Sequence, residues 1–218
     1  MRIVIAGGHG RIALRLERLL AGRGDEVAGI IRSGGQAADL RDAGAEPLLL
    51  DLESASVEEV AEVLRGADAA VFAAGAGPGS GAARKETVDR AAAVLFADAA
   101  VRAGVRRHVV VSAMGADPAH PGDEVFDAYL RAKGAADAYV RSLDALDWTV
   151  LRPGRLADGP GTGLVRLEAR TGRGEIPRDD VAAVLAELVD TSATAGLTLE
   201  LIGGSTPVPV AVKSVAGN

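Results

Sequence analysis

Residues 3–13 read Ile-Val-Ile-Ala-Gly-Gly-His-Gly-Arg-Ile-Ala, and this stretch decides the fold. The apolar run 3–6 predicts a buried strand, and the amphipathic stretch 11–21 predicts a helix directly after the glycines. The turn fits G-x-x-G-x-x-A from Gly7 and G-x-G-x-x-A from Gly8. In both readings the glycines let backbone N–H groups approach a phosphate at the start of the helix, and Ala13 lets helix and strand pack closely.

This turn predicts a dinucleotide site rather than a mononucleotide-triphosphate loop. A strand before it and a helix after it are the context that such a site requires, and the chain has no Gly-Lys pair for a triphosphate loop. The alternative is a glycine-rich turn without a ligand, in a chain with 28 glycines. The predicted cofactor contacts in the turn are Gly7, Gly8, His9, Gly10, Arg11 and Ile12.

Short apolar runs alternate with longer helical patterns along the rest of the chain. The predicted strands are 3–6, 27–31, 47–50, 69–73, one beginning at 109–111, and 149–151, and the predicted helices are 11–21, 36–43, 57–64, 84–103 and 124–143. Strands that are apolar on both faces indicate a parallel sheet covered by helices on both sides. The predicted fold class is therefore α/β, a doubly wound parallel sheet of the Rossmann type.

The pattern changes after Pro153. We expect residues 1–153 to form an NAD(P)-binding core, and residues 154–218 to form a small substrate-side subdomain that completes the same globule. Within the second part, 158–163 predicts a loop or mobile lid, and an aspartate at 179 or 180 predicts a helix start. Residues 197–202 predict a strand, and the segment 207–209, with two prolines, predicts an edge strand or an extended tail.

Composition excludes several classes of protein. The chain is 48% hydrophobic and 25% charged with a formal net charge of −6, which predicts a globular protein without nucleic-acid contact or a basic membrane patch. It has no cysteine, so disulfides, thiol catalysis and cysteine-ligated metals are excluded. The three histidines, His9, His108 and His120, show no ligand spacing, and no metal site is predicted. We expect a cytoplasmic protein, because no apolar run suits a signal peptide or a membrane span; the oligomeric state is left open.

The end of the second predicted strand carries a cation. No acid stands in the run 28–33 where an NAD-preferring site holds the ribose 2′-hydroxyl, and Asp25 and Glu26 precede the strand. The guanidinium of Arg32 and the hydroxyl of Ser33 suit a 2′-phosphate instead. We therefore expect NADP(H) to be favoured over NAD(H), the alternative being a solvated surface arginine.

Tyr129 and Lys133 lie four residues apart in the predicted helix 124–143, which places them on one helical face. A phenol has an ordinary pKa of about 10, and a neighbouring ammonium lowers the pKa of the phenol by stabilising the phenolate. This pair therefore predicts acid–base chemistry, with the lysine also reaching a ribose hydroxyl of a nicotinamide cofactor. The alternative is an ordinary amphipathic helix with a half-buried tyrosine and a solvated lysine.

Over essentially its whole length the sequence resembles atypical short-chain dehydrogenases/reductases, the NAD(P)-dependent epimerase/dehydratase-like branch that includes NmrA-like redox sensors. The glycine turn and the Tyr129–Lys133 pair carry the resemblance, together with an ordered series of short motifs: Asp51-Leu52, Ala73-Ala74-Gly75, Glu86-Thr87-Val88-Asp89, Val109-Val110-Val111-Ser112, Leu151-Arg152-Pro153-Gly154, and 176–182. The resemblance implies a set of cofactor contacts: Asp51 and Leu52 at the adenine, Ala73, Ala74 and Gly75 at the adenosine ribose, and Pro153, Gly154 and Leu156 at the nicotinamide.

The resemblance also implies catalytic roles. Tyr129 would be the acid/base, Lys133 its partner and a cofactor contact, and Ser112 the candidate for holding the substrate oxygen. The sequence departs from the family at Ala113 and Met114, where the catalytic hydroxyl often falls, and at 91–93, where three alanines replace an expected asparagine. Two functions follow: an NADP-dependent oxidoreductase or epimerase acting on a small carbonyl or hydroxyl substrate, or a non-catalytic NADP-binding redox sensor.

Overall fold

A single large sheet organises the molecule, of which the computed structural model describes residues 1–77 and 79–217. Within these residues the strand order is β11-β8-β10-β6-β5-β4-β1-β2-β3. The strands are β1 (Arg2–Ala6), β2 (Glu26–Ile31), β3 (Glu46–Leu49), β4 (Ala69–Phe72), β5 (Arg107–Val111), β6 (Asp147–Pro153), β8 (Leu164–Glu168), β10 (Leu197–Gly203) and β11 (Thr206–Pro207). All neighbours from β3 to β10 pair in parallel, and β8 and β11 are antiparallel at the edge.

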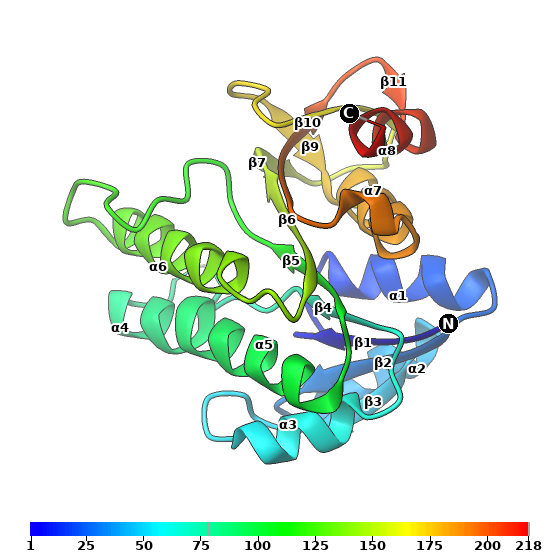
Figure 1. Ribbon diagram of the computed structural model, residues 1–218, viewed down its shortest axis with the longest axis vertical. Helices are drawn as coiled ribbons and strands as arrows, with labels where there is room; N and C mark the ends of the chain where they lie inside the picture. The colour runs from blue at the N-terminus through cyan, green and yellow to red at the C-terminus, as the bar shows by residue number, and fades with distance from the viewer. Residues whose placement is uncertain (78, 218) are drawn as a thin grey trace.

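Helices cover both faces of the sheet, as Figure 1 shows. The helices are α1 (Ala13–Gly22), α2 (Ala37–Asp42), α3 (Val57–Leu64), α4 (Ala82–Arg84), α5 (Ala92–Ala103), α6 (Val125–Arg141), α7 (Arg178–Asp190) and α8 (Val208–Ala216), with short 3₁₀ turns η1 (Gly34–Gln36) and η3 (Ser192–Thr194). Helices α1, α7 and α8 pack on one face, and α3, α5 and α6 on the other. The order β3-β2-β1-β4-β5-β6 with both faces covered confirms the predicted doubly wound fold.

Each face of the sheet has its own hydrophobic core. Along β1 the side chains alternate, so that Ile3 and Ile5 join the core under α1 and α7, whereas Val4 and Ala6 join the core under α3 and α5. All four residues are completely buried. This is why the first strand reads as a continuous apolar run rather than an alternating one.

The predicted helix 84–103 is helical throughout, but its first part is not an α-helix. Residues Lys85–Ala91 form a π-helical segment, η2, which joins α4 to α5. Gly104, with φ +75°, ends α5 in the left-handed conformation that glycine adopts without strain. The π-helical segment matters because such segments occur often at functional sites.

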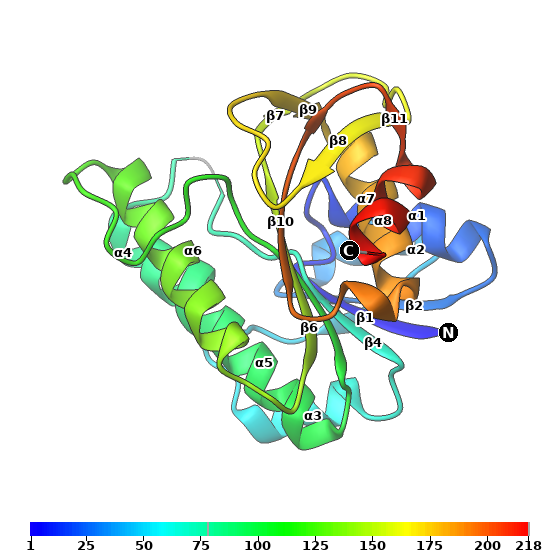
Figure 2. The same ribbon diagram turned by 45° about the horizontal axis from the view of Figure 1, so that its top comes forward.

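The carboxyl-terminal part holds more regular structure than the sequence indicates. Two short strands, β7 (Arg155–Ala157) and β9 (Glu175–Pro177), form a small parallel pair, and neither they nor β8 was predicted. Figure 2 shows these strands gathered with β8 and β11 beside α7 and α8. Strands β10, β8 and β11 extend the same sheet as residues 1–153, and the division after Pro153 stays a sequence prediction.

Two expectations for this part are met only in part. Pro207 ends the edge strand β11, but α8 and not an extended tail follows it, with Pro209 in the first turn, where a helix needs no backbone N–H from it. Residues 158–163 form the predicted loop, which is fixed at 161–163: Gly161 N donates to Asp179, and the backbone N–H groups of Thr162 and Gly163 donate to Asp180. No helix in the described part of the chain is both long enough and apolar enough to cross a membrane.

Candidate cofactor and active site

A cleft of about 240 Å³ opens where the strand order reverses, between β1 and β4. The reversal point of a doubly wound sheet is the position at which such folds bind ligands. The lining comes from the ends of β1, β2, β3 and β4 and from η2 and α5: Gly7, His9, Gly10, Ile30, Ile31, Arg32, Gln36, Leu50, Asp51, Leu52, Glu53, Ala73, Ala74, Gly75, Ala76, Arg84, Val88 and Ala92. The cleft thus brings together the predicted contacts Gly7, His9, Gly10, Arg32, Asp51, Leu52, Ala73, Ala74 and Gly75.

The glycine turn is held by close backbone contacts. Gly7 has φ +77°, and a Cβ there would lie 2.6 Å from the Cα of Ala74, so this position requires glycine. The N–H of Gly10 donates to the carbonyl of Gly7 at 2.8 Å and closes the turn. Gly8 does not line the cleft: its Cβ would meet the Cα of Gly29 at 2.8 Å, and its N–H donates to Ile30. This contact gives Gly8 a packing role against β2.

Charged side chains surround the end of β2. Arg32 is about half exposed, and its Nη1 lies 3.9 Å from Glu53, which also accepts from Arg84 at 2.7 Å. Arg84, with the hydroxyl of Thr87, holds the pKa of Glu53 below its ordinary value. His9 is fixed beside them, because its ring nitrogens contact Asp39 at 2.6 Å and Gln36 at 3.2 Å. Ser33, the other predicted contact here, precedes η1 and does not line the cleft.

Lys133 is a buried cation with three acceptors. Its Nζ lies 3.4 Å from Asp89 Oδ1 and donates to the carbonyls of Val111 at 3.1 Å and Ala74 at 3.3 Å. Asp89, on η2, is completely buried and also accepts from Ala76 N. The lysine therefore joins α6 to the carboxyl ends of β4 and β5 and to the π-helical segment.

The expected lowering of the Tyr129 pKa is wrong. Tyr129 lies half-buried on α6 between Phe126, 5.8 Å away between ring centroids, and Lys85, whose Nζ is 5.5 Å from the ring centroid. Burial, followed by the charges of Asp89 and Asp137, raises the pKa of the phenol above its ordinary value. The charge of Lys133 is directed at Asp89 instead, so the phenol remains protonated over a wide range of pH.

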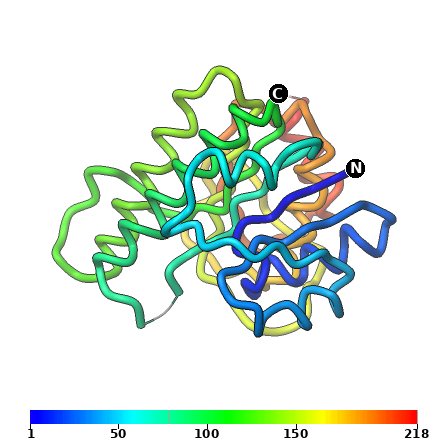
Figure 3. Tube along the Cα trace, turned by 90° about the horizontal axis from the view of Figure 1, so that it is seen from below, coloured from blue at the N-terminus to red at the C-terminus, as the bar shows by residue number. Residues whose placement is uncertain are grey.

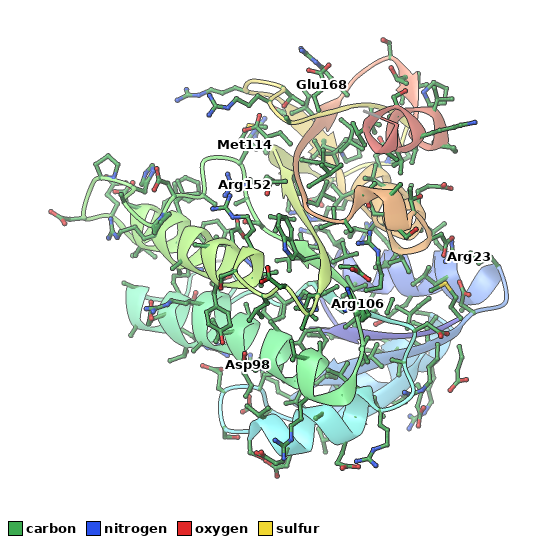
Figure 4. The ribbon with its side chains drawn as sticks, in the orientation of Figure 1. Arg23, Asp98, Arg106, Met114, Arg152 and Glu168 are labelled. Atoms are coloured by element: carbon green, nitrogen blue, oxygen red, sulfur yellow. The ribbon has the colours of Figure 1, made fainter. Side chains whose placement is uncertain are left out.

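Ser112, at the end of β5, belongs to a buried network rather than to an open surface. Its hydroxyl donates to Asp137 Oδ2 at 2.8 Å, and the same oxygen accepts from Nε and Nη2 of Arg152 at 2.9 and 2.8 Å. Asp137 is completely buried, which raises the pKa of its carboxyl despite these partners. Figure 4 shows Arg152 reaching from β6 toward α6, with Met114 above it. In this arrangement the serine proton is directed to Asp137.

The predicted nicotinamide contacts lie outside the cleft. Pro153 is the last residue of β6, and its carbonyl accepts from Met114 N at 3.1 Å. Gly154 packs so closely that a Cβ would lie 2.4 Å from the carbonyl oxygen of Gly174, so glycine is required there for chain packing. Leu156 is a partly buried member of β7 that packs against the core. Arg11 and Ile12 also lie outside: Ile12 packs against the core, and Arg11 pairs with Asp158.

Several residues of the site were not predicted from the sequence. Glu53 lies shortly after β3 and Arg84 is the last residue of α4, and no sequence motif marks either of them. Asp89 was quoted only as part of a motif, without a role. Asp137 had a usable signal, because it follows Lys133 by four residues, just as Lys133 follows Tyr129, so all three occupy one face of α6.

The residues present fit a dinucleotide. Glycines at positions 7 and 10 leave the backbone open toward the first helix, which has no acidic residue in its first turn to repel a phosphate. The adenosine end is lined by apolar residues such as Leu52 and Val88, with arginines at its rim. Within the described residues no group of three or more histidine, aspartate or glutamate side chains is placed to hold a metal ion.

Comparison with known proteins agrees with this geometry. The model of a family described as NAD(P)H-binding matches residues 7–192. An uncharacterized sugar epimerase of Bacillus subtilis, YhfK, is 35% identical over 99% of this chain and 100% of its own. A structure from Bacillus halodurans, assigned as an NAD-dependent epimerase/dehydratase, is 34% identical with TM-score 0.90, covering 98% and 99% of the two chains. The Lactococcus lactis oxidoreductase ylbE is 27% identical with TM-score 0.88, covering 100% and 98%. The chain therefore belongs to the NAD(P)H-binding family, with relatives named as epimerases and oxidoreductases.

Proposed function

We propose that this chain is an NADP(H)-dependent oxidoreductase or epimerase of the short-chain dehydrogenase/reductase type, acting on a small carbonyl or hydroxyl substrate. The observation that carries the proposal is the cleft at the reversal point of the sheet, which joins the glycine turn to the ends of β2, β3 and β4. Family membership supports the nicotinamide cofactor, and the names of the relatives support redox or epimerase chemistry.

Two arginines support the preference for NADP(H). Arg32 and Arg84 converge on Glu53 at the rim of the cleft, so the cationic end of the site is already assembled around one carboxylate. A 2′-phosphate carries more charge than a carboxylate and suits the planar guanidinium. Arg32→Met should weaken NADP(H) binding about tenfold or more and leave NAD(H) binding nearly unchanged, measured by calorimetric titration. Arg41→Met, at an exposed position of α2, is the matched control. Equal wild-type affinities for the two nucleotides would refute this preference.

Tyr129 is proposed as the proton donor. When bound, the nicotinamide ring supplies or accepts a hydride. The Tyr129 phenol keeps its proton at neutral pH and so has one to donate to the oxygen of a carbonyl substrate, although its raised pKa makes it a weaker acid than an ordinary tyrosine. Lys133 holds α6 against β4 and β5 through two carbonyls and Asp89, so contact with a cofactor ribose hydroxyl requires it to exchange one of these partners. Ser112 donates to Asp137 within a buried network, and its role in holding a substrate oxygen stays a prediction.

The test is NADPH oxidation against a panel of small aldehydes and ketones, with Tyr129→Phe beside Tyr139→Phe. The second tyrosine is the right control because it lies on the same helix but donates to Asp98, whereas Tyr129 lies beside Lys85; neither side chain lines the cleft itself. Tyr129→Phe should lower turnover by about 10²–10⁴ while NADPH affinity changes little. Turnover that survives this change would remove Tyr129 from the mechanism.

A second candidate is a non-catalytic NADP-binding redox sensor. The ion pair of Lys133 with Asp89 and the hydrogen bond of Ser112 to Asp137 favour it, because both side chains are already engaged within the protein. A sensor would bind NADP(H) with the same dependence on Arg32, but neither wild type nor Tyr129→Phe would oxidise NADPH with any carbonyl offered. The same panel therefore distinguishes the two.

A further inference from the structure

Two arginines share one carboxylate oxygen beside the glycine turn. Arg11, at the end of that turn, donates through Nη2 to Asp158 Oδ1 at 2.5 Å. Arg178, the first residue of α7, donates through Nη1 to the same oxygen at 2.6 Å. Arg11 and Asp158 are both exposed, at 61% and 60% of their side chains, whereas Arg178 is only 16% exposed. The most buried member of the cluster is therefore a cation.

The loop that carries Asp158 lies next to the glycine turn before α1, although the two segments are far apart in the sequence. In Figure 3 the yellow part of the chain, which includes this loop, passes behind the blue part, and the hydrogen bond of Arg11 to Asp158 joins residues 147 apart in the sequence. Its continuation, 161–163, is fixed by Asp179 and Asp180, and Asp179 also pairs with Arg15 on α1. These contacts hold the loop at its carboxyl end, whereas Asp158 is held only by the two arginines.

Two cations share the single charge of Asp158. Arg11 and Arg178 both pair with it, whereas Arg15 pairs with Asp179, and Asp180 accepts from backbone N–H groups of the loop. Arg11 also lies within two residues of the first helical position of α1, whose first turn contains no acidic side chain. The helix dipole and the free N–H groups of that turn add to the positive potential. The surroundings therefore favour an anion of higher charge than one carboxylate.

We propose that Arg11 and Arg178 form a two-arginine clamp for the diphosphate of the cofactor, and that Asp158 is an internal competitor for the clamp. The proposal rests on the proposed function, because it takes the nicotinamide dinucleotide as the ligand of the glycine turn. Guanidinium groups bind carboxylate and phosphate oxygens through the same N–H donors, so a diphosphate displaces Asp158 without a change in the arginines. Arg178 thereby becomes a cofactor contact from the carboxyl-terminal part of the chain, and the segment 157–160 loses its attachment when the diphosphate binds.

The first test removes the competitor. Asp158→Asn keeps the shape of an exposed side chain and deletes its charge, so it leaves the fold intact. Affinity for NADP⁺ and for NAD⁺ should rise by the same factor, about three- to tenfold, because the diphosphate is common to both nucleotides. Asp144→Asn, an exposed aspartate far along the chain from the cluster, is the charge-matched control and should change neither affinity. A change for one nucleotide only, or no change, would overturn the proposal.

The second test removes the buried arm of the clamp. Arg178→Met should weaken binding of both nucleotides about tenfold, in contrast to Arg32→Met, which is expected to affect NADP⁺ alone. Arg173→Met, on the turn before β9, is the matched control because that side chain is exposed and has no ion-pair partner within the described residues. In the Asp158→Asn background the arginine change should cost more affinity than it does in the wild type, because Arg178 then no longer gives up its ion pair with Asp158 when the diphosphate binds.

Limited proteolysis gives a readout that does not depend on affinity. Saturating NAD⁺ should increase cleavage within 157–160 in the wild type, since the diphosphate frees Asp158, and should have little effect in Asp158→Asn, where the segment is already released. Protection of the segment by NAD⁺ in the wild type would overturn the displacement. If the wild type binds neither nucleotide, the proposed function fails; if it binds both and the variants behave like the controls, only the clamp fails.

Discussion

Glu17 provides the sharpest prediction about stability, because it is a carboxyl buried without a partner. It lies on α1, is completely inaccessible to solvent, and neither carboxyl oxygen has a hydrogen-bond partner in the described part of the structure. Its Oε1 is so close to β2 that a Cβ at Gly29 would lie 2.6 Å away. Burial raises the pKa of Glu17 from an ordinary 4.5 to about 8, and the charge of Arg18 offsets only part of this.

The sign of the effect follows from proton uptake. Between pH 4.5 and about 8 the folded chain holds the Glu17 proton, whereas the unfolded chain has released it. The unfolded state therefore binds fewer protons, and the free energy of unfolding decreases as pH rises, by about 1.4 kcal/mol per pH unit. The loss begins near pH 4.5, reaches about 3 kcal/mol at pH 7, and levels off at about 5 kcal/mol above pH 8.

Glu17→Gln removes the titration and keeps the size of the side chain. Near pH 5 the variant and wild type should differ little, because both carry a neutral group. At about pH 8.5 the variant should be more stable by several kcal/mol, so that the difference grows by roughly 3–4 kcal/mol across this range. The assay is urea unfolding at both pH values, followed by the fluorescence of Trp148, the single tryptophan.

The comparison cancels every other titration, because wild type and variant share all remaining groups. Glu46→Gln, an exposed glutamate on the edge strand β3, is the matched control and should give a small difference that does not depend on pH. A Glu17→Gln difference that is equally constant would show that the carboxyl is ionised or solvated in the folded chain, and would refute the reasoning.

Three other positions give predictions about stability. His108 is completely buried, neither of its ring nitrogens has a hydrogen-bond partner among the residues the structure describes, and burial lowers its pKa to about 3. Stability should therefore fall as pH drops below about 6.5, and His108→Phe should abolish this acid sensitivity and raise the melting temperature at pH 5. Gly134→Ala should destabilise by about 2–4 kcal/mol in urea unfolding, because its Cβ would meet loop backbone at 2.3 Å, whereas Gly22→Ala, with open space, should be neutral or stabilising. Arg152→Met should cost about 3 kcal/mol by leaving Asp137 buried without its cation, and adding Asp137→Asn should recover part of the loss.

The sequence predicted many of the residues that line the cleft, because local rules place the glycine turn and the ends of the strands at one edge of the sheet. A strand followed by glycines and a helix has one geometry, and the carboxyl ends of parallel strands meet at one edge of the sheet. Gly7, Asp51 and Ala73 therefore line one cleft although they follow different strands. The roles of Gly8 and Gly154 were not predictable in the same way, since what decides them is a close approach to Gly29 and Gly174, which are distant in sequence.

The carboxyl-terminal strands were missed for a related reason. In β8 only Val165 and Leu167 are buried, and the pattern of five residues is too short to distinguish from a loop. The prolines of 207–209 predicted an edge strand or an extended tail, whereas Pro209 lies in the first turn of α8, where a helix tolerates proline. In both places the local residue pattern is too short to identify the element. For β8, the strand that pairs with it, β10, also lies about 30 residues further along the chain.

The predicted catalytic residues show what the spacing of residues in a sequence cannot predict. Four-residue steps correctly placed Tyr129 and Lys133 on one face of α6, but a shared face determines only the direction of a side chain. The partner of the lysine is set by what faces it, and here η2 presents Asp89 while β4 and β5 present carbonyls. Because the π-helical segment positions Asp89, the charge state of the tyrosine depends on an element that the sequence showed only as ordinary helix. The pKa of Tyr129 thus depends partly on the η2–α6 contact, and changes in η2 should alter this pKa without touching either residue of the pair.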